Sequence, residues 1–427
     1  MPSQHRRLLL ALTAVLVVLW IVLVVRGLGK AGVLIEKRPN DIWAYHVAAR
    51  GVWERDLVPS YNDPERSNLY PPTFAILVSP LGLLGYRGAA VVWVLLSGAL
   101  VVWIFRSMER SLTIPLSPVA KGAGLLLVLR MIDGDMANGN ANIAVLALVL
   151  GALGLAARGR ELWGGGLLAV AILAKVSPVI VLALGAYRLR WRFLLGAAIG
   201  LVLLGAVLPV AVLGPQGASE AWAHWYRNTL DHVDPASEAY SKAEGGGYEP
   251  GQSLRALVHR LLRPTDATSH DGEVVTIHLA SLSKRTVDVV YLGLALAILA
   301  AVLLGLWRRA PGLRRAFRPE EIAAACALMV LLAPLSRKAH FVALWPAAVL
   351  GFEAWRHSDG RRLQRVGSGL WSLALVCVAA TSPDIAGRAA ATYFLGYCPF
   401  SLAALALLAL VSWPGFFPRV IQLAKKV

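Results

Sequence analysis

The sequence predicts an all-α, polytopic integral membrane protein with about twelve transmembrane helices. Of the 427 residues, 57% are hydrophobic and only 16% are charged, whereas a soluble domain contains about a quarter charged residues. The mean hydropathy is +0.61, and apolar runs that approach the length needed to cross a bilayer recur along the chain. These observations exclude a soluble globular enzyme, a disordered chain and a disulfide-rich secreted domain.

The apolar runs locate the expected spans. The first, 8–25, is interpreted as an uncleaved helix, because Arg26 and Lys30 follow it where a signal peptide needs a small-residue cleavage site. Segments 163–174 and 177–187 are short and could form a single crossing instead of two. The remaining expected spans are 89–105, 118–131, 142–157, 193–213, 286–307, 321–334, 340–355, 367–381 and 398–412.

The distribution of Lys and Arg orients these spans. Short loops on one side hold 22 of the 42 Lys and Arg residues, and short loops on the other side hold 5. Because the side rich in Lys and Arg faces the cytoplasm, both termini are expected to be cytoplasmic and the long segments 27–88 and 214–285 exoplasmic. Merging 163–187 into one crossing would move the arginines of 308–318 and 356–365 outside, which favours two crossings there.

The whole chain, 1–427, is therefore expected to form one domain of the cell (plasma) membrane. Its net charge of +17 is explained by anionic lipid at the cytoplasmic face, so it indicates no nucleic-acid partner. Three cysteines without regular spacing indicate neither a disulfide framework nor a zinc site. The sequence contains no nucleotide-binding fingerprint.

The first exoplasmic segment contains a candidate catalytic carboxylate, Asp41. Asn40 or Asp41 suits a helix N-cap, and an apolar stripe follows at spacings of three and four: Ile42, Tyr45, Ala49 and Val52. This pattern predicts a short amphipathic helix at the outer interface with Asp41 at its N-terminal end. The carboxylate could serve as a general base, or it could simply cap the helix.

Further polar residues lie in the turns expected on the same side. Tyr70-Pro71-Pro72 predicts a rigid extended corner, followed by a re-entrant or interface-lying segment over 72–86, although packing alone also explains it. Other candidates are Asp133, Asp135, Asn138, Asn140, Asn142, Lys175, Gln252, Arg255, Arg337, Lys338 and His340. Lys175 could instead extend its side chain to the membrane surface without binding a ligand. Segment 334–341 could likewise be an ordinary solvated turn.

In order along the chain, these motifs resemble glycosyltransferase family 87 of the GT-C superfamily. The matching motifs are Asp41-x-x-x-Tyr45, Tyr70-Pro71-Pro72, Gly139-Asn140-Ala141-Asn142, Lys175-x-x-Pro178, Gln252-Ser253-Leu254 and Pro334…His340. The chain departs from the family pattern at Asn140, where Gln is common, at Gly251, where Asn is common, and at Ala339, where a second His is common. These departures bear on the sugar and the acceptor more than on the reaction class.

The resemblance implies a GT-C-like enzyme that transfers a sugar, with mannose favoured, from a polyprenyl-phosphate donor to a lipid or glycan acceptor at the exoplasmic face. It assigns Asp41 as the general base of an inverting reaction. The implied donor- and acceptor-binding residues are Tyr45, Tyr70, Asn140, Asn142, Lys175, Gln252, Arg255, Arg337, Lys338 and His340. No cofactor is expected; a divalent metal is compatible with the pattern, but no tight carboxylate cluster requires one.

Two alternatives stay open at this point. The same chemistry could transfer arabinofuranose or another pentose or hexose. The chain could also be a transporter or flippase of lipid-linked sugars, but a transporter is expected to carry ionisable residues near the middle of its spans. Here the outer segments hold most of the acids, which favours the enzyme.

Overall fold

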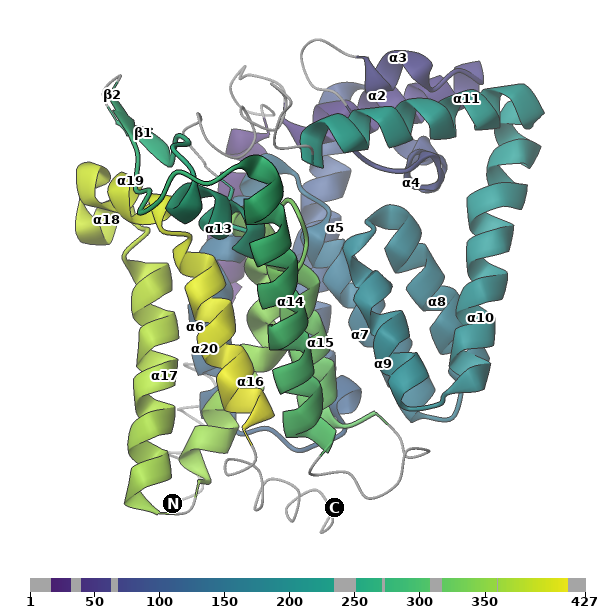
Figure 1. The fold of residues 1–427 in the computed structure, drawn as a ribbon. Helices are drawn as coiled ribbons and strands as arrows, with labels where there is room; N and C mark the ends of the chain where they lie inside the picture. The colour runs from purple at the N-terminus through teal and green to yellow at the C-terminus, as the bar shows by residue number, and fades with distance from the viewer. Residues whose placement is uncertain are drawn as a thin grey trace.

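The computed structural model describes residues 17–31, 40–62, 68–233, 251–270, 273–307, 317–358 and 360–413 (Figure 1). Almost all of the regular structure in these ranges is helical, which confirms the all-α prediction. The exception within them is a small antiparallel hairpin, β1 (Thr268–His270) and β2 (Glu273–Val275), in which Ser269 lies opposite Val274. Residues 8–16 of the first predicted span lie outside the described residues, and 17–30 are helical.

An outer layer of short helices covers one end of a helical bundle (Figure 1). It contains α2 (Asp41–Glu54), α3 (Val58–Tyr61), α4 (Pro72–Leu77) and the 3₁₀-helix η1 (Ser79–Leu83). Helix α2 begins at Asp41, as its apolar stripe predicts, and buries Ile42, Tyr45, Ala49 and Val52. The predicted segment 72–86 forms α4, η1 and the start of the next helix, so it folds back within the outer layer.

The bundle itself is built from longer helices around one apolar core. Trp345, Phe341 and Phe400 are fully buried in this core. Its helices are α5 (Tyr86–Leu112), α6 (Pro118–Asn138), α7 (Asn142–Ala157), α8 (Glu161–Ala174), α9 (Ile180–Tyr187), α10 (Trp191–Val202), α11 (Leu208–Val233), α13 (Leu254–Leu262), α14 (Lys284–Trp307), α15 (Pro319–Leu331), α16 (Trp345–Arg356), α17 (Arg361–Ala379), α18 (Pro383–Ala386), α19 (Arg388–Gly396) and α20 (Pro399–Ser412). Three short elements interrupt the series: η2 (Ser177–Val179), the π-helical turn η3 (Leu203–Val207) and η4 (Lys338–Leu344).

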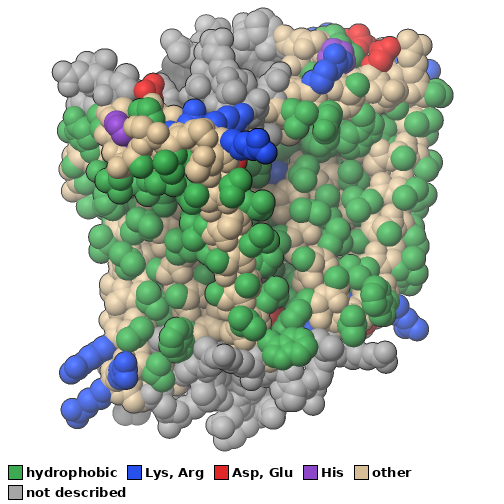
Figure 2. All heavy atoms as spheres, in the orientation of Figure 1, with side chains coloured by type: hydrophobic (Ala, Val, Ile, Leu, Met, Phe, Trp, Pro, Cys, Tyr) green, Lys and Arg blue, Asp and Glu red, His purple; other side chains and the backbone are tan. Residues whose placement is uncertain are grey.

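By length and composition, three described helical stretches can cross a membrane: Tyr86–Leu112, Trp191–Leu230 and Lys284–Trp307. Two further pairs of helices are bent at a short break: α6 and α7 by 119°, and α19 and α20 by 63°. If each pair forms one span, the number of membrane-crossing stretches rises to five. Figure 2 shows hydrophobic side chains over the middle of one face, with Lys and Arg gathered toward its two ends. The chain is thus a polytopic membrane protein. The number of crossings, twelve, stays a prediction.

The packing of α8 on α10 indicates whether segments 163–174 and 177–187 form one crossing or two. A Cβ atom at Gly165 would collide with the carbonyl oxygen of Phe193, and one at Gly200 would lie 2.7 Å from the Cβ of Ala169. Later residues of α8 therefore face later residues of α10, so the two helices run parallel. The chain must return between them through η2 and α9, which supports two separate passes.

Helix α11 bends at Gly214, where φ is 77° and ψ is 166°. Its second half lies across the outer layer (Figure 1). There the indole N–H of Trp222 donates to the Gly205 carbonyl at 3.0 Å, and that of Trp225 donates to the Leu69 carbonyl at 3.2 Å. This part of α11 thus holds the chain just before Tyr70 in place.

The orientation across the membrane is tested by cysteine labelling. Ser219 on α11 and Ser281 before α14 are exposed and expected outside, whereas the exposed Arg160 is expected inside. With the native cysteines buried, a membrane-impermeant maleimide should label Ser219→Cys and Ser281→Cys in intact cells. It should label Arg160→Cys only after the membrane is opened, and the reverse pattern would contradict the predicted orientation.

Candidate active site

Asp41 is the first helical residue of α2, and its carboxylate is not the helix cap. Asn40 is the N-cap, because its side-chain oxygen accepts a hydrogen bond from the Ile42 N–H at 3.0 Å. The alternative of a plain N-cap for Asp41 is therefore wrong. The carboxylate lies in the first turn, at the positive end of the helix dipole, and it is half-buried.

A tight turn between α6 and α7 brings Asn140 to this carboxylate. Gly139 ends α6 in the left-handed region, with φ at 69°, and the Asn140 N–H donates to the Asp135 carbonyl at 2.9 Å. A Cβ atom at Gly139 would collide with the side chain of Ile42, so only glycine lets the turn approach the start of α2. The Asn140 amide then donates a hydrogen bond to Oδ2 of Asp41.

Asp135 fixes the far side of the same turn. Its fully buried carboxylate accepts hydrogen bonds from the Asn142 side-chain amide at 2.7 Å, the Asn142 N–H at 3.3 Å and the Ile143 N–H at 3.2 Å. These are the first backbone donors of α7, so Asp135 caps that helix from the preceding one. Asp133, two residues earlier, instead pairs with Arg26 at 3.0 Å.

Lys175 joins the group from the end of α8. The helix stops there, where Lys175 adopts an extended conformation, and the ammonium donates to Oδ1 of Asn142 at 2.6 Å. Burial lowers the pKa of the Lys175 ammonium to about 8, while the carboxylates of Asp135 and Asp41 act in the opposite direction. Lys175 therefore does not extend to the surface, which was the alternative interpretation of its sequence position.

Two tyrosines line the apolar side of the site. The Tyr45 hydroxyl donates to the Tyr70 hydroxyl at 2.8 Å, and both rings are buried. Tyr70 stacks on Phe74, and its ring lies 6.0 Å from the Lys175 ammonium. The rigid corner predicted at 70–72 thus places Tyr70 between α2 and Lys175.

Arg337, Lys338 and His340 approach from the turn that precedes α16. The positive charge of Arg337 lies close enough to Lys175 to lower the pKa of its ammonium. Lys338 lies against Gly134, the residue before Asp135: a Cβ atom placed at Gly134 would be 2.8 Å from Cε of Lys338. Nδ1 of His340 accepts the Arg337 N–H at 3.2 Å. A neutral His340 therefore carries its proton on Nε2. Arg337 and Lys338 thus add positive charge near Lys175 and Gly134.

Gln252 and Arg255 take other roles. The backbone N–H of buried Gln252 donates to the Ser336 carbonyl at 2.6 Å, and its side-chain amide donates to the Leu395 carbonyl at 2.8 Å. Gln252 therefore anchors the turn before Arg337. Arg255 pairs with Asp288 on α14 at 2.9 Å. Arg255, one of the predicted donor- and acceptor-binding residues, therefore belongs to a neighbouring ion pair.

The arrangement combines the Asp41 carboxylate, held by the Asn140 amide, with the nearby positive charges of Lys175 and Arg337. Such a carboxylate can accept a proton, and the cations can stabilise negative charge that develops on a nearby group. Among the described residues, no group of three or more His, Cys, Asp or Glu side chains is placed to hold a metal ion. The capping role of Asp135 had no signal in the sequence, because it depends on the angle between two helices.

Comparison with known proteins gives a family match. The profile of glycosyltransferase family 87 matches residues 68–335. Among solved structures, the chain is similar to ArnT from Cupriavidus metallidurans in the apo state, at 13% identity and a TM-score of 0.39, covering 97% of this chain and 78% of that one. It is also similar to the same protein bound to undecaprenyl phosphate, at 14% identity and a TM-score of 0.35, covering 94% and 77%. No curated protein matches the chain.

The turn at Gly139 is tested by comparing two alanine substitutions. Gly139 and Gly159 both have positive φ, at 69° and 77°, but no atom lies within 4 Å of a Cβ placed at Gly159. Both changes should cost about 1–2 kcal/mol of backbone strain, and Gly139→Ala should add about 1–3 kcal/mol of overpacking against Ile42. The thermal unfolding midpoint should therefore fall further for Gly139→Ala than for Gly159→Ala, and equal losses would contradict the packing argument.

Proposed function

Because this chain belongs to glycosyltransferase family 87, we propose that it transfers mannose from a polyprenyl-phosphate donor to a hydroxyl of a lipid or glycan acceptor. The observation that carries the proposal is the contact between Asp41 and Asn140, within electrostatic reach of the Lys175 ammonium. A proton acceptor and a phosphate-binding side are the two elements that such a transfer needs.

The proposed reaction has Asp41 as the general base. An acceptor hydroxyl attacks the anomeric carbon from the face opposite the phosphate and gives its proton to the Asp41 carboxylate. A β-linked donor then yields an α-linked product by inversion. Asn140 fixes the carboxylate through its hydrogen bond to Oδ2, and base assistance of this kind contributes about 10²–10⁴ in rate.

The departing lipid phosphate is stabilised by positive charge in this proposal. It is weakly basic and needs charge neutralisation more than a proton. Lys175, Arg337 and Lys338 supply the charge, and His340 can donate a hydrogen bond from Nε2. Tyr45 and Tyr70 line the sugar side, while Gln252 supports the turn that carries the cations.

The proposal includes a site on the exoplasmic side of the cell membrane, with both termini in the cytoplasm. Its support is the distribution of Lys and Arg, with 22 in the short loops on one side and 5 on the other. The site residues lie in turns and helix ends that this topology assigns to the outside.

Radiolabelled polyprenyl-phosphate-mannose, incubated with the purified protein and lipid extracts, tests the proposal. Label should move from the donor to an acceptor product with native protein. In Asp41→Asn, turnover should fall by about two orders of magnitude while donor binding survives, because the amide cannot accept the proton. Near-native turnover in a folded Asp41→Asn protein would overturn the base assignment.

The matched control is Asp56→Asn. Asp56 is exposed, and its Oδ1 accepts the Val58 N–H at 3.0 Å. It shares the outer layer with Asp41 but does not contact the site, so turnover should change little. If only pentose donors are used by the native protein, the sugar is arabinofuranose or a relative and the mannose assignment fails.

The pKa of Lys175, about 8, predicts the alkaline side of the pH profile. The ammonium is charged below this pH and neutral above it, so kcat should fall as pH rises through about 8 if the charge holds the leaving phosphate. In Lys175→Arg the guanidinium stays charged, and the fall should move to higher pH. Identical alkaline limbs for the two proteins would remove Lys175 from this role.

A further inference from the structure

The side-chain amide of Asn142 links Asp135 to Lys175. Its Nδ2 donates to Oδ1 of Asp135 at 2.7 Å, and its Oδ1 accepts a hydrogen bond from the Lys175 ammonium at 2.6 Å. Asn142 is only 6% exposed, and Asp135 is fully buried. The carboxyl group, the amide and the ammonium therefore stand in series where α6, α7 and α8 meet.

The order of hydrogen bonds in this series is fixed by chemistry. An amide has a donating end and an accepting end of nearly the same shape, whereas an ammonium only donates. Oδ1 of Asp135 is also fixed as an acceptor, because it receives the backbone N–H of Asn142 at 3.3 Å. A flipped amide would direct its N–H groups at the ammonium and its oxygen at Oδ1, and both contacts would be repulsive. The two neighbours of Asn142 therefore determine its orientation.

Asp135 is the rigid end of the series. Its Oδ2 accepts the Ile143 N–H at 3.2 Å, and its backbone carbonyl accepts the Asn140 N–H at 2.9 Å. These bonds hold the carboxyl group against the first turn of α7 without help from the Asn142 side chain. Lys175, at the other end, carries its ammonium on a flexible four-carbon chain. The rigid carboxyl group thus orients the amide, and the amide positions the flexible ammonium.

Charged groups from several elements face the Lys175 ammonium. The carboxyl groups of Asp135 on α6 and Asp41 on α2 raise the pKa of this ammonium, and Arg337, in the turn before η4, lowers it. His340 in η4 is also close enough to interact with the ammonium. Among the charges that act on Lys175, Asp135 has the largest effect, which agrees with its place behind Asn142.

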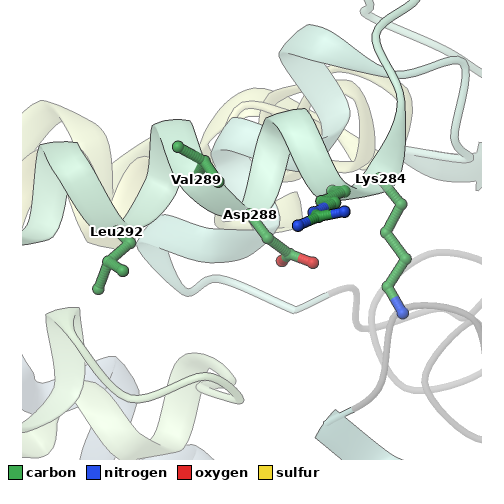
Figure 3. A pocket seen from close by; sticks show the side chains of 5 residues that line it. Lys284, Asp288, Val289 and Leu292 are labelled. Atoms are coloured by element: carbon green, nitrogen blue, oxygen red, sulfur yellow. The ribbon is translucent and has the colours of Figure 1, made fainter.

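Asp288 illustrates the other way to place a carboxylate beside a cation. It contacts Arg255 directly at 2.9 Å, and it lies near Lys284 in an open cavity at the start of α14 (Figure 3). A direct pair of this kind offsets the positive charge of the cation. At Asp135, in contrast, a neutral amide stands between the carboxyl group and the ammonium.

We propose that Asp135 is a positioning residue for Lys175, which it orients through the side-chain amide of Asn142. The amide lets the carboxyl group hold the ammonium in place without forming an ion pair with it, so the positive charge stays available to a bound phosphate. Asn142 then acts as an internal bridge, a role different from the donor or acceptor binding that the family resemblance implies. The link to the lipid phosphate rests on the proposed function, whereas the positioning does not.

The titration of Lys175 tests the positioning without any sugar transfer. The side chain is partly exposed, so the full-length protein can be treated with trace acetic anhydride over a range of pH. Mass spectrometry follows acetylation of Lys175, which only the neutral amine undergoes. In the native protein the midpoint should lie at about pH 8. In Asp135→Asn it should fall by about one pH unit, because a nearby opposite charge that favours the ammonium is lost.

The exchanged variant, Asp135→Asn combined with Asn142→Asp, carries the same two side chains in reverse order. An amide at position 135 can still accept the N–H groups of α7 and donate to a carboxylate at position 142, which then contacts the ammonium directly. The midpoint should therefore return to the native value or exceed it. The matched control is Asp133→Asn on the same helix: Asp133 pairs with Arg26 at 3.0 Å, and its loss should leave the midpoint unchanged.

Two results would overturn the positioning role and leave Asp135 as a helix cap alone. One is an equal midpoint in the native protein and Asp135→Asn, and the other is a midpoint in the exchanged variant as low as in Asp135→Asn. Binding of farnesyl phosphate, in nanodiscs of neutral phosphatidylcholine, tests the link to phosphate separately. At neutral pH it should weaken about tenfold in the exchanged variant, where the ammonium is paired. Unchanged binding with the predicted midpoints would refute the phosphate-binding role of Lys175 and leave its positioning by Asp135 standing.

Discussion

The buried carboxylate of Asp135 is the constraint on which the candidate site depends. A buried carboxyl group is tolerated only when its oxygens accept hydrogen bonds, and leaving a buried polar group without its partner typically costs about 1–3 kcal/mol. Here the partners are the first N–H groups of α7 and the side-chain N–H of Asn142. The amide oxygen of Asn142 in turn accepts a hydrogen bond from the Lys175 ammonium. Three helices therefore meet at one carboxylate, and the turn that carries Asn140 has a single position relative to α2.

The polar residues of the site lie at interruptions of helices, and this placement has a physical reason. Backbone groups at a helix end lack partners within the helix, and an apolar surrounding provides no water to satisfy them. Gly139 ends α6, Lys175 ends α8 and Asp41 begins α2. The side chains at these helix ends are therefore fixed close to one another in the folded protein.

The outer layer makes the opposite side of the site rigid. Helix α11 crosses it and binds the backbone before Tyr70 through the indole of Trp225, while Tyr45, Tyr70 and Phe74 pack ring against ring. Aromatic pairs of this kind contribute about 0.5–1.5 kcal/mol each beyond their buried area. The Asp41 carboxylate and the Lys175 ammonium are thus held by different layers, with Tyr70 between α2 and Lys175.

Local patterns in the sequence determined the helical class, the start of α2 at Asp41 and the apolar face that this helix buries. Such signals act over three or four positions along the chain, and they suffice for helix ends and apolar faces. The tertiary structure decided that Asn40 caps α2 while Asp41 meets Asn140, 99 residues away. It also decided that Arg255 pairs with Asp288 and that Asp135 caps α7. These outcomes depend on the angle between α6 and α7 and on the close approach that Gly139 permits, which arise only when distant helices pack together.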